Sequence, residues 1–130
     1  MSNLNNYTIF AIPTFNEIES IEAMIIEFRK AKLPFFIIDN ASTDGTIEKA
    51  KELNTEIHQR GDFGSSYGSA IMKGMKIAQD KGYKYLGFVD CDNTYPVSAF
   101  LDFFPFLEAN DMLVGVISFD TIAPVRRVGN

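Results

Sequence analysis

The chain has 130 residues, of which 46% are hydrophobic and 22% are charged, and this balance fits one globular domain with a single core. Its formal net charge of -5 argues against a nucleic-acid-binding surface, because contacts to nucleic-acid phosphates need clustered Lys and Arg side chains. One cysteine and one histidine exclude an internal disulfide framework and a Cys/His zinc centre.

Short apolar runs alternate along the chain with segments of helical periodicity. Residues 7–12 are almost all apolar, which is typical of a strand covered on both faces, and Pro13 is expected to end this strand. Residues 18–28 predict a helix, because large apolar side chains recur there at helical spacing. Further strands are predicted at residues 35–39, 56–59, 85–89 and 112–118, and further helices at residues 46–53, 67–82 and 97–108, the last bent at Pro105.

The alternation of strands and helices predicts an α/β fold, in which a mostly parallel sheet carries helices on both faces. We expect a single domain over residues 1–130. In such sheets ligands bind beyond the carboxyl ends of the strands. The loops of interest therefore follow Ile12, Ile38 and Val89.

The loop after Val89 reads FVDCDNTYP and offers two carboxylates, Asp90 and Asp92. Alternation along an extended chain places these two side chains on the same side and Cys91 on the other. Two close carboxylates repel each other unless a cation lies beside them, and Mg²⁺ and Mn²⁺ bind through one or two carboxylates plus substrate phosphates. A solvated, Asp-rich turn explains the pair equally well. Cys91 is expected to be a small buried residue and not a nucleophile.

The two earlier loops also place polar groups at strand ends. In IIDNASTDGT, Asp39 or Asn40 can hydrogen-bond a nucleobase or a ribose, while residues 44–46 fit a turn and a helix cap. In IPTFNE, Pro13 is extended, Phe15 offers an aromatic face to a base, and Glu17 fits either a polar contact or an acidic first helical turn. None of these loops is specific by itself.

The order of four motifs, IPTFNE, IIDNASTDGT, YGSAIMKGM and FVDCDNTYP, resembles the family-two glycosyltransferases of GT-A fold, over about residues 7–96. The likeness is greatest to the branch of dolichyl-phosphate and other polyprenyl-phosphate sugar synthases. It implies a Rossmann-like nucleotide-sugar-binding sandwich. The positions that match the family's nucleotide-sugar site are Pro13, Phe15, Glu17, Asp39, Asn40 and Asp90. Asp90 and Asp92 match its metal ligands, with Thr94 as a helper, and the metal would be Mn²⁺ or Mg²⁺.

The resemblance implies transfer of a sugar from a nucleoside diphosphate to an acceptor, which in this branch is a polyprenyl phosphate. The metal would neutralise charge on the leaving diphosphate. No catalytic base can be assigned from the sequence.

The chain departs from the family pattern at three points. Asn40 stands where a second acid is frequent, which leaves the base preference open. The Arg that often follows the fifth strand is missing, so Arg126 and Arg127 either bind phosphate instead or belong to the surface. Family members usually continue well beyond this length, and we therefore expect the acceptor-binding part to be lacking.

The sequence also bears on where the protein works. No run reaches the ~20 apolar residues of a membrane-spanning helix, and MSNLNNYT has none of the features of a signal peptide. We expect a cytoplasmic location, at the cytoplasmic face of a membrane if the full-length protein uses a lipid-linked phosphate.

The sequence also fits two alternative functions. A phosphatase of the haloacid dehalogenase type would use Asp90 as nucleophile and Asp92 as acid and base, but no Lys follows Thr94. A non-catalytic module would bind nucleotide or a partner chain. The aromatic residues of 100–107 would then form an apolar patch for homo-oligomers or a membrane surface, unless they pack on the sheet as an ordinary helix.

Overall fold

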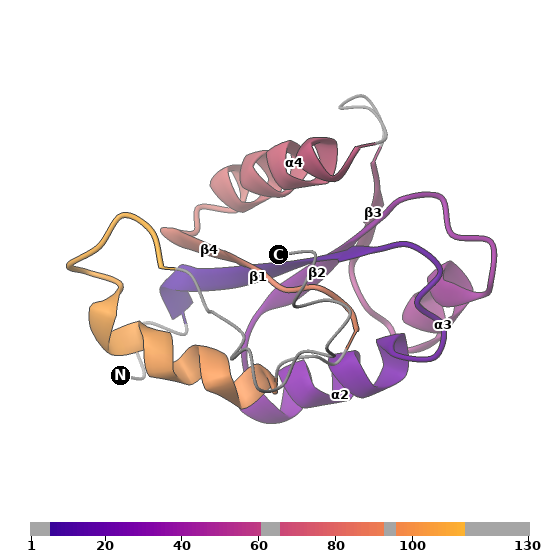
Figure 1. The fold of residues 1–130 in the computed structure, drawn as a ribbon, viewed down its shortest axis with the longest axis horizontal. Coiled ribbons are helices and arrows are strands. Elements are labelled where there is room, and N and C mark those ends of the chain that lie inside the picture. The colour runs from indigo at the N-terminus through magenta and orange to yellow at the C-terminus, as the bar shows by residue number, and fades with distance from the viewer. Residues whose placement is uncertain (1–5, 61–65, 93–95, 114–130) are drawn as a thin grey trace, which may run out of the picture.

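The computed structural model describes residues 6–60, 66–92 and 96–113. Within them the chain forms a four-stranded parallel sheet of order β3-β2-β1-β4 (Figure 1). The strands are β1 (Thr8–Thr14), β2 (Phe35–Asp39), β3 (Ile57–Gln59) and β4 (Tyr85–Phe88). Each of them lies within two residues of the position that the sequence predicts.

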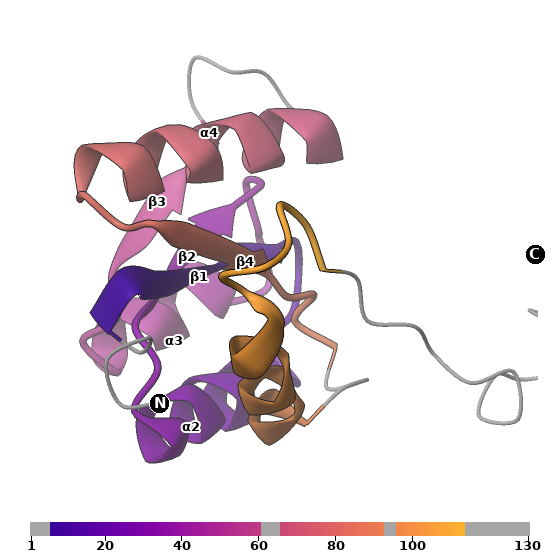
Figure 2. The same cartoon turned by 90° about the vertical axis from the view of Figure 1, so that its left-hand side faces the viewer.

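Helices cover both faces of this sheet. They are α2 (Ile21–Ala31), α3 (Thr46–Glu52), α4 (Tyr67–Asp80) and the 3-10 helix η2 (Val97–Phe106). Figure 2 views the layers from the side, with α4 above the sheet and α2 and η2 below it. α3 packs beside α2 and β3. The predicted α/β fold with a parallel sheet and helices on both faces is confirmed.

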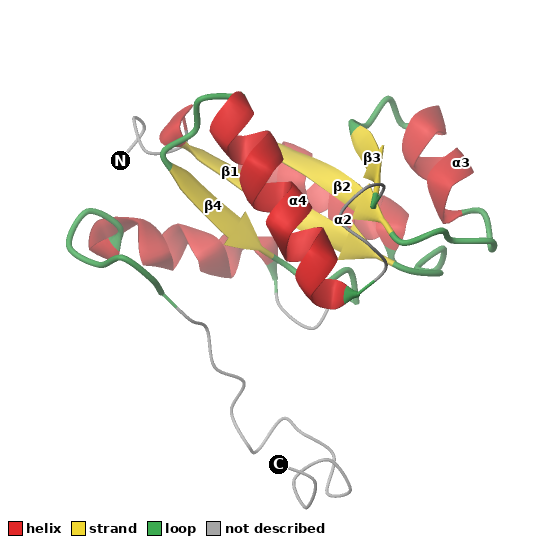
Figure 3. Cartoon of the chain, turned by 90° about the horizontal axis from the view of Figure 1, so that it is seen from above, coloured by secondary structure: helices red, strands yellow, loops and turns green. Residues whose placement is uncertain are grey.

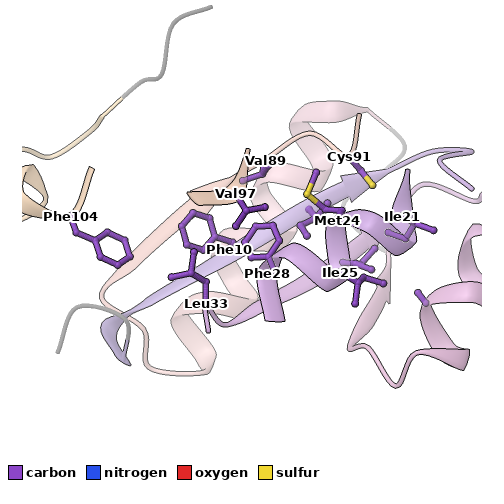
Figure 4. Packing of buried hydrophobic residues seen from close by; sticks show 13 residues of the cluster. Phe10, Ile21, Met24, Ile25, Phe28, Leu33, Val89, Cys91, Val97 and Phe104 are labelled. Atoms are coloured by element: carbon purple, nitrogen blue, oxygen red, sulfur yellow. The ribbon is translucent and has the colours of Figure 1, made fainter. Parts of the chain in front are cut away.

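Strand β1 is apolar from Ile9 to Pro13, between a threonine at each end, because both of its faces are buried. Phe10 and Ile12 belong to the cluster that β1 forms with α2 and η2, whereas Ile9 and Ala11 belong to the cluster under α4. Figure 4 shows the first of these clusters, in which the ring of Phe28 from α2 lies against the ring of Phe10. Alternation along one strand thus supplies two separate cores.

Pro13 does not end β1, as the sequence analysis expected, but lies within it. Its partner in the register with β2 is Ile38. The carbonyl of Thr14 accepts a hydrogen bond from the backbone N–H of Asn40, just after β2. Because backbone groups alternate in direction along a strand, those of Pro13 face the opposite side, toward β4. Pairing with β4 ends at Ala11, so the missing N–H of Pro13 removes no bond from the sheet.

Residues 97–108 do not form the predicted α-helix. Pro105 has no N–H to donate to a carbonyl four residues earlier, and at the end of η2 the N–H of Leu107 donates to Phe104, three residues back. Phe104 is buried, and the ring centroid of Phe100 lies 5.4 Å from that of Phe10. Phe106 is 57% exposed. The packing of Phe100 and Phe104 nevertheless favours the expectation of a helix packed on the sheet over that of a broad apolar patch.

Replacing Gly87 with alanine is expected to destabilise the fold by about 1–3 kcal/mol, because the new methyl group overpacks the core. A Cβ at Gly87 would lie 2.5 Å from two carbons of the buried Phe10 ring. Urea unfolding measures the change. Gly68→Ala is the matched control, since its Cβ would meet only the Ser66 hydroxyl at 3.7 Å. Alanine stabilises a helix by up to ~1 kcal/mol relative to glycine, so this variant should not lose stability. Equal stability of the two variants would contradict this account of the sheet.

The strand predicted at residues 112–118 lies almost entirely outside the described residues, and Met112 and Leu113 are not part of a strand. Within the described part of the chain, no helix has the length and apolar character needed to cross a membrane.

Candidate functional site

Three loops meet at the carboxyl edge of the sheet, because β1, β2 and β4 run in the same direction (Figure 3). We call them the β1 loop (residues 15–20), the β2 loop (residues 40–45) and the β4 loop (residues 89–92). All six residues assigned to the nucleotide-sugar site, and both assigned to the metal, lie in these loops or at the last positions of β1 and β2.

The β1 and β2 loops are joined through Asn16. Its backbone N–H donates to Ser42 Oγ at 2.8 Å, and its Oδ1 accepts from the backbone N–H of Thr43 at 2.8 Å. Asn16 has a φ of 52°, a left-handed conformation that Asn tolerates better than most residues. One asparagine therefore fixes the position of the β2 loop relative to β1.

Asp44 and Thr46 continue this connection. The N–H of Glu17 donates to Thr46 Oγ1 at 2.9 Å, and the N–H of Ile18 donates to Asp44 Oδ2 at 3.1 Å. Asp44 Oδ1 accepts from the N–H and the hydroxyl of Thr46. Although desolvation opposes it, these hydrogen bonds hold the pKa of Asp44 below its usual value. The sequence indicated a turn and cap here, and the structure adds that the same side chains bind the neighbouring loop.

Asp39 is fully buried at the end of β2. Its Oδ1 accepts hydrogen bonds from Thr14 Oγ1 at 2.7 Å and Ser42 Oγ at 2.6 Å, and its Oδ2 accepts from the N–H of Ser42 at 2.8 Å. These bonds occupy most of the acceptor positions of the carboxylate. Asp39 thus holds the ends of β1 and β2 together, which the sequence analysis did not anticipate.

Arg60, just after β3, was also missed. Its N–H donates to the carbonyl of Asp39, and its guanidinium donates to Asn40 Oδ1. Because a guanidinium only donates, this contact identifies the atom of Asn40 that faces it as the oxygen and leaves the amide nitrogen as a donor. A lone Arg directly after the third predicted strand was the available signal.

Carboxylates gather where the β1 and β4 loops approach each other. Asp90 and Asp92 are both exposed, whereas Cys91 between them is buried, as alternation predicts. Partial burial, followed by repulsion from Asp92, Asp44 and Asp90, raises the pKa of Glu17. The site therefore carries closely spaced negative charge that a cation would relieve.

Cys91 is a buried thiol of low reactivity. Burial, and then the charges of Glu17, Asp92 and Asp90, raise its pKa to about 12. The expected burial of Cys91 is confirmed, and since the thiolate is the nucleophile, the raised pKa agrees with the expectation that Cys91 is not one.

Tyr67, the first residue of α4, lies beside this acidic group. Its hydroxyl donates to Asp90 Oδ1 at 3.2 Å. Burial and the charge of Asp90 raise the pKa of Tyr67, so the hydroxyl keeps its proton at neutral pH. The motif YGSAIMKGM predicts a helix and contributes to the family resemblance, but nothing in its pattern links Tyr67 to Asp90.

The donor set fits a divalent cation that shares its coordination with a ligand. In the described part of the chain, no group of three or more His, Cys, Asp or Glu side chains is arranged to hold a metal ion. Mg²⁺ usually takes one or two carboxylates, completes its shell with water and phosphate oxygens, and does not need a protein cage. Asp90 and Asp92 meet that requirement.

Replacing Glu17 with glutamine is expected to raise stability at neutral pH and to have less effect in acid. Because the pKa of Glu17 is raised in the folded state, its contribution to stability is complete below the ordinary value of 4.5 and is lost as the pH rises through the folded-state pKa. Glutamine has no such charge, so its advantage over Glu17 should grow over the same pH range. Urea midpoints of wild type and variant at about pH 4 and about pH 7 measure the difference. If the stability of Glu17→Gln relative to wild type fell as the pH rose, Glu17 would not be repelled by the neighbouring aspartates.

The model of glycosyl transferase family 2 matches residues 9–127, and the chain therefore belongs to glycosyl transferase family 2. A comparison with curated proteins gives no match.

Solved structures of glucosyl-3-phosphoglycerate synthase from Mycobacterium tuberculosis are similar in fold. The complex with uridine diphosphate has a TM-score of 0.66 and 18% identity, covering 85% of this chain and 44% of that chain. The complex with Mn²⁺ and uridine-diphosphate-glucose has a TM-score of 0.65 and 20% identity, covering 82% and 43%. The chain thus spans less than half the length of that protein. The likeness confirms the Rossmann-like GT-A fold.

Three residues considered in the sequence analysis, Thr94, Arg126 and Arg127, lie outside the described residues. The family match favours the transferase over the phosphatase alternative for Asp90.

Proposed function

We propose that the chain forms the donor site of a glycosyltransferase that moves a sugar from a nucleoside diphosphate to an acceptor with the help of Mn²⁺ or Mg²⁺. The observation that carries this proposal is the pair of exposed carboxylates, Asp90 and Asp92, at the carboxyl edge of the sheet beside the joined β1 and β2 loops. Family membership supports the same class of activity.

The nucleoside would lie across the β1 and β2 loops. Phe15 is 56% exposed, and an exposed aromatic face suits a stacked base. Asn40 offers an amide donor whose orientation Arg60 fixes, and uracil and guanine both have carbonyl oxygens to accept it. Pro13 gives the end of β1 a fixed backbone shape. Glu17 and Asp39 are the other residues assigned to the nucleoside part of the site. Asp39 would act mainly by supporting the loops, through its hydrogen bonds to Thr14 and Ser42.

The diphosphate would lie near the β4 loop. Asp90 and Asp92 would hold the metal, which supplies Lewis-acid stabilisation of the leaving diphosphate. Without a cation these carboxylates would repel the nucleotide, since the chain is acidic overall. The similar structures with Mg²⁺ or Mn²⁺ and a uridine nucleotide support this choice of ions.

For the acceptor we propose a phosphorylated molecule. The resemblance to polyprenyl-phosphate sugar synthases favours a lipid-linked phosphate, whereas several similar structures contain phosphoglyceric acid. A lipid-linked acceptor would bring the protein to the cytoplasmic face of a membrane. The two acceptors are distinguished by assaying the longest natural form of the protein for transfer of labelled sugar to polyprenyl phosphate and to phosphoglyceric acid. Equal transfer to unphosphorylated alcohols would contradict the proposal.

Calorimetric titration with UDP and GDP, in Mn²⁺ and again in excess chelator, tests the donor site. We expect one diphosphate to bind in Mn²⁺ and to lose most of its affinity in chelator. Binding that ignores the metal would overturn the metal's role. A folded chain that binds neither diphosphate would favour the non-catalytic alternative of a partner-binding module.

A further inference from the structure

We propose that Tyr67 is a positioning residue of the metal site, which holds the carboxylate of Asp90 through one oxygen so that the other oxygen takes the cation. This inference rests on the proposed function of Asp90 as a metal ligand. It adds a residue from α4 to a site that the motifs place in the loops after β1, β2 and β4.

The contact is a single hydrogen bond between a helix and a loop. Tyr67 donates to Asp90 Oδ1 at 3.2 Å. Among the described residues, Asp90 Oδ2 takes part in no hydrogen bond that would compete with a cation. Within the part of the chain that the structure describes, the carboxylate is thus held by one oxygen while the other remains available.

The helix that carries Tyr67 is firmly placed. Ser66 caps α4 by accepting from the N–H of Ser69 at 3.1 Å. Gly74 lets α4 approach the sheet closely, because a Cβ there would lie 3.0 Å from the Phe88 ring and 3.2 Å from Ile38. A side chain on a packed helix is a better support for a ligand-binding loop than another loop residue. Phe88 is also the last residue of β4, two positions before Asp90.

A phenol suits this position for an electrostatic reason. A Lys or Arg beside Asp90 would also hold the carboxylate, but its positive charge would compete with the metal ion. The hydroxyl of Tyr67 orients Asp90 and leaves its full negative charge for the cation. Its 53% exposure places Tyr67 at the surface, where a bound ligand can reach the pair.

The test compares Tyr67→Phe with Tyr7→Phe. Tyr7 is 52% exposed and precedes β1, so the matched substitution removes a hydroxyl at the opposite edge of the sheet. Mn²⁺ is titrated into each protein with saturating UDP. We expect Tyr67→Phe to weaken Mn²⁺ binding about three- to tenfold, the range for one lost hydrogen bond, and Tyr7→Phe to leave it unchanged. Residual UDP binding in chelator and the melting temperature should stay at their wild-type values for both.

A spectroscopic measurement tests whether bound Mn²⁺ lies close to Tyr67, without a comparison of affinities. In protein labelled with 3-fluorotyrosine, the fluorine signal that is absent from Tyr67→Phe belongs to Tyr67. Added Mn²⁺ should broaden this signal more strongly than that of Tyr7.

The outcomes separate the two proposals. If wild type binds Mn²⁺ with UDP but Tyr67→Phe binds it equally well or more tightly, the role of Tyr67 is overturned and the donor site stands. If wild type itself binds no Mn²⁺ with UDP, the donor site fails and the role of Tyr67 fails with it.

Discussion

Asp39→Ala is expected to lower the free energy of unfolding by about 2–4 kcal/mol. Asp39 is fully buried and accepts hydrogen bonds from the hydroxyls of Thr14 and Ser42 and from the N–H of Ser42. Alanine would leave these three donors without their acceptor, the Thr14 hydroxyl in a buried position and the two Ser42 groups in a partly buried one. The ends of β1 and β2 would lose their connection, and nucleotide binding would weaken as a secondary effect.

Urea unfolding at neutral pH measures this loss, with Asp80→Ala as the control. Asp80 forms an exposed ion pair with Lys76 at 2.8 Å on the surface of α4, and such a pair contributes about 0.5 kcal/mol or less. Asp39→Ala should therefore be several times more destabilising than Asp80→Ala. Similar values for the two would mean that Asp39 does not support the loops.

Asp92→Ala is expected to reduce metal-dependent UDP binding at least about 100-fold, since even residues behind a metal ligand change metal affinity by 10–100-fold. Asp92 is exposed, and its substitution should leave the fold intact. Calorimetry in Mn²⁺ gives the affinity, and circular dichroism confirms the fold.

Asp102→Ala provides the comparison, because Asp102 is an exposed aspartate on η2, outside the three loops. It should bind UDP as wild type does. If Asp92→Ala kept its Mn²⁺-dependent affinity, Asp92 would have no part in the metal site, and the loop FVDCDNTYP would be an ordinary turn.

Much of the fold follows from local patterns in the sequence. The strand at 35–39 was predicted to the residue, since a short apolar run between turn residues leaves few alternatives. Two features depended on tertiary neighbours. Pro13 stays within β1 because pairing on its other side has already ended, and η2 is a 3-10 helix around Pro105. Neither circumstance is visible from the spacing of apolar residues.

The candidate site was predictable as a location and less so as a set of contacts. Parallel strands bring their carboxyl ends to one edge, so the strand order along the sequence is enough to predict that Asp39, Asp90 and Asp92 lie at the same edge. The partners of these acids come from distant segments, such as Tyr67 for Asp90 and Thr14 for Asp39. A sequence pattern shows which side chains are available but not which pairs meet across 20 or more residues.

The most direct measurement is a crystal structure of the chain with Mn²⁺ and UDP, with the metal located by its anomalous scattering. The account predicts Mn²⁺ at the carboxylates of Asp90 and Asp92, in contact with the diphosphate, and the base against Phe15 and Asn40. A nucleotide bound away from the carboxyl edge of the sheet, or Mn²⁺ bound without either aspartate, would contradict it.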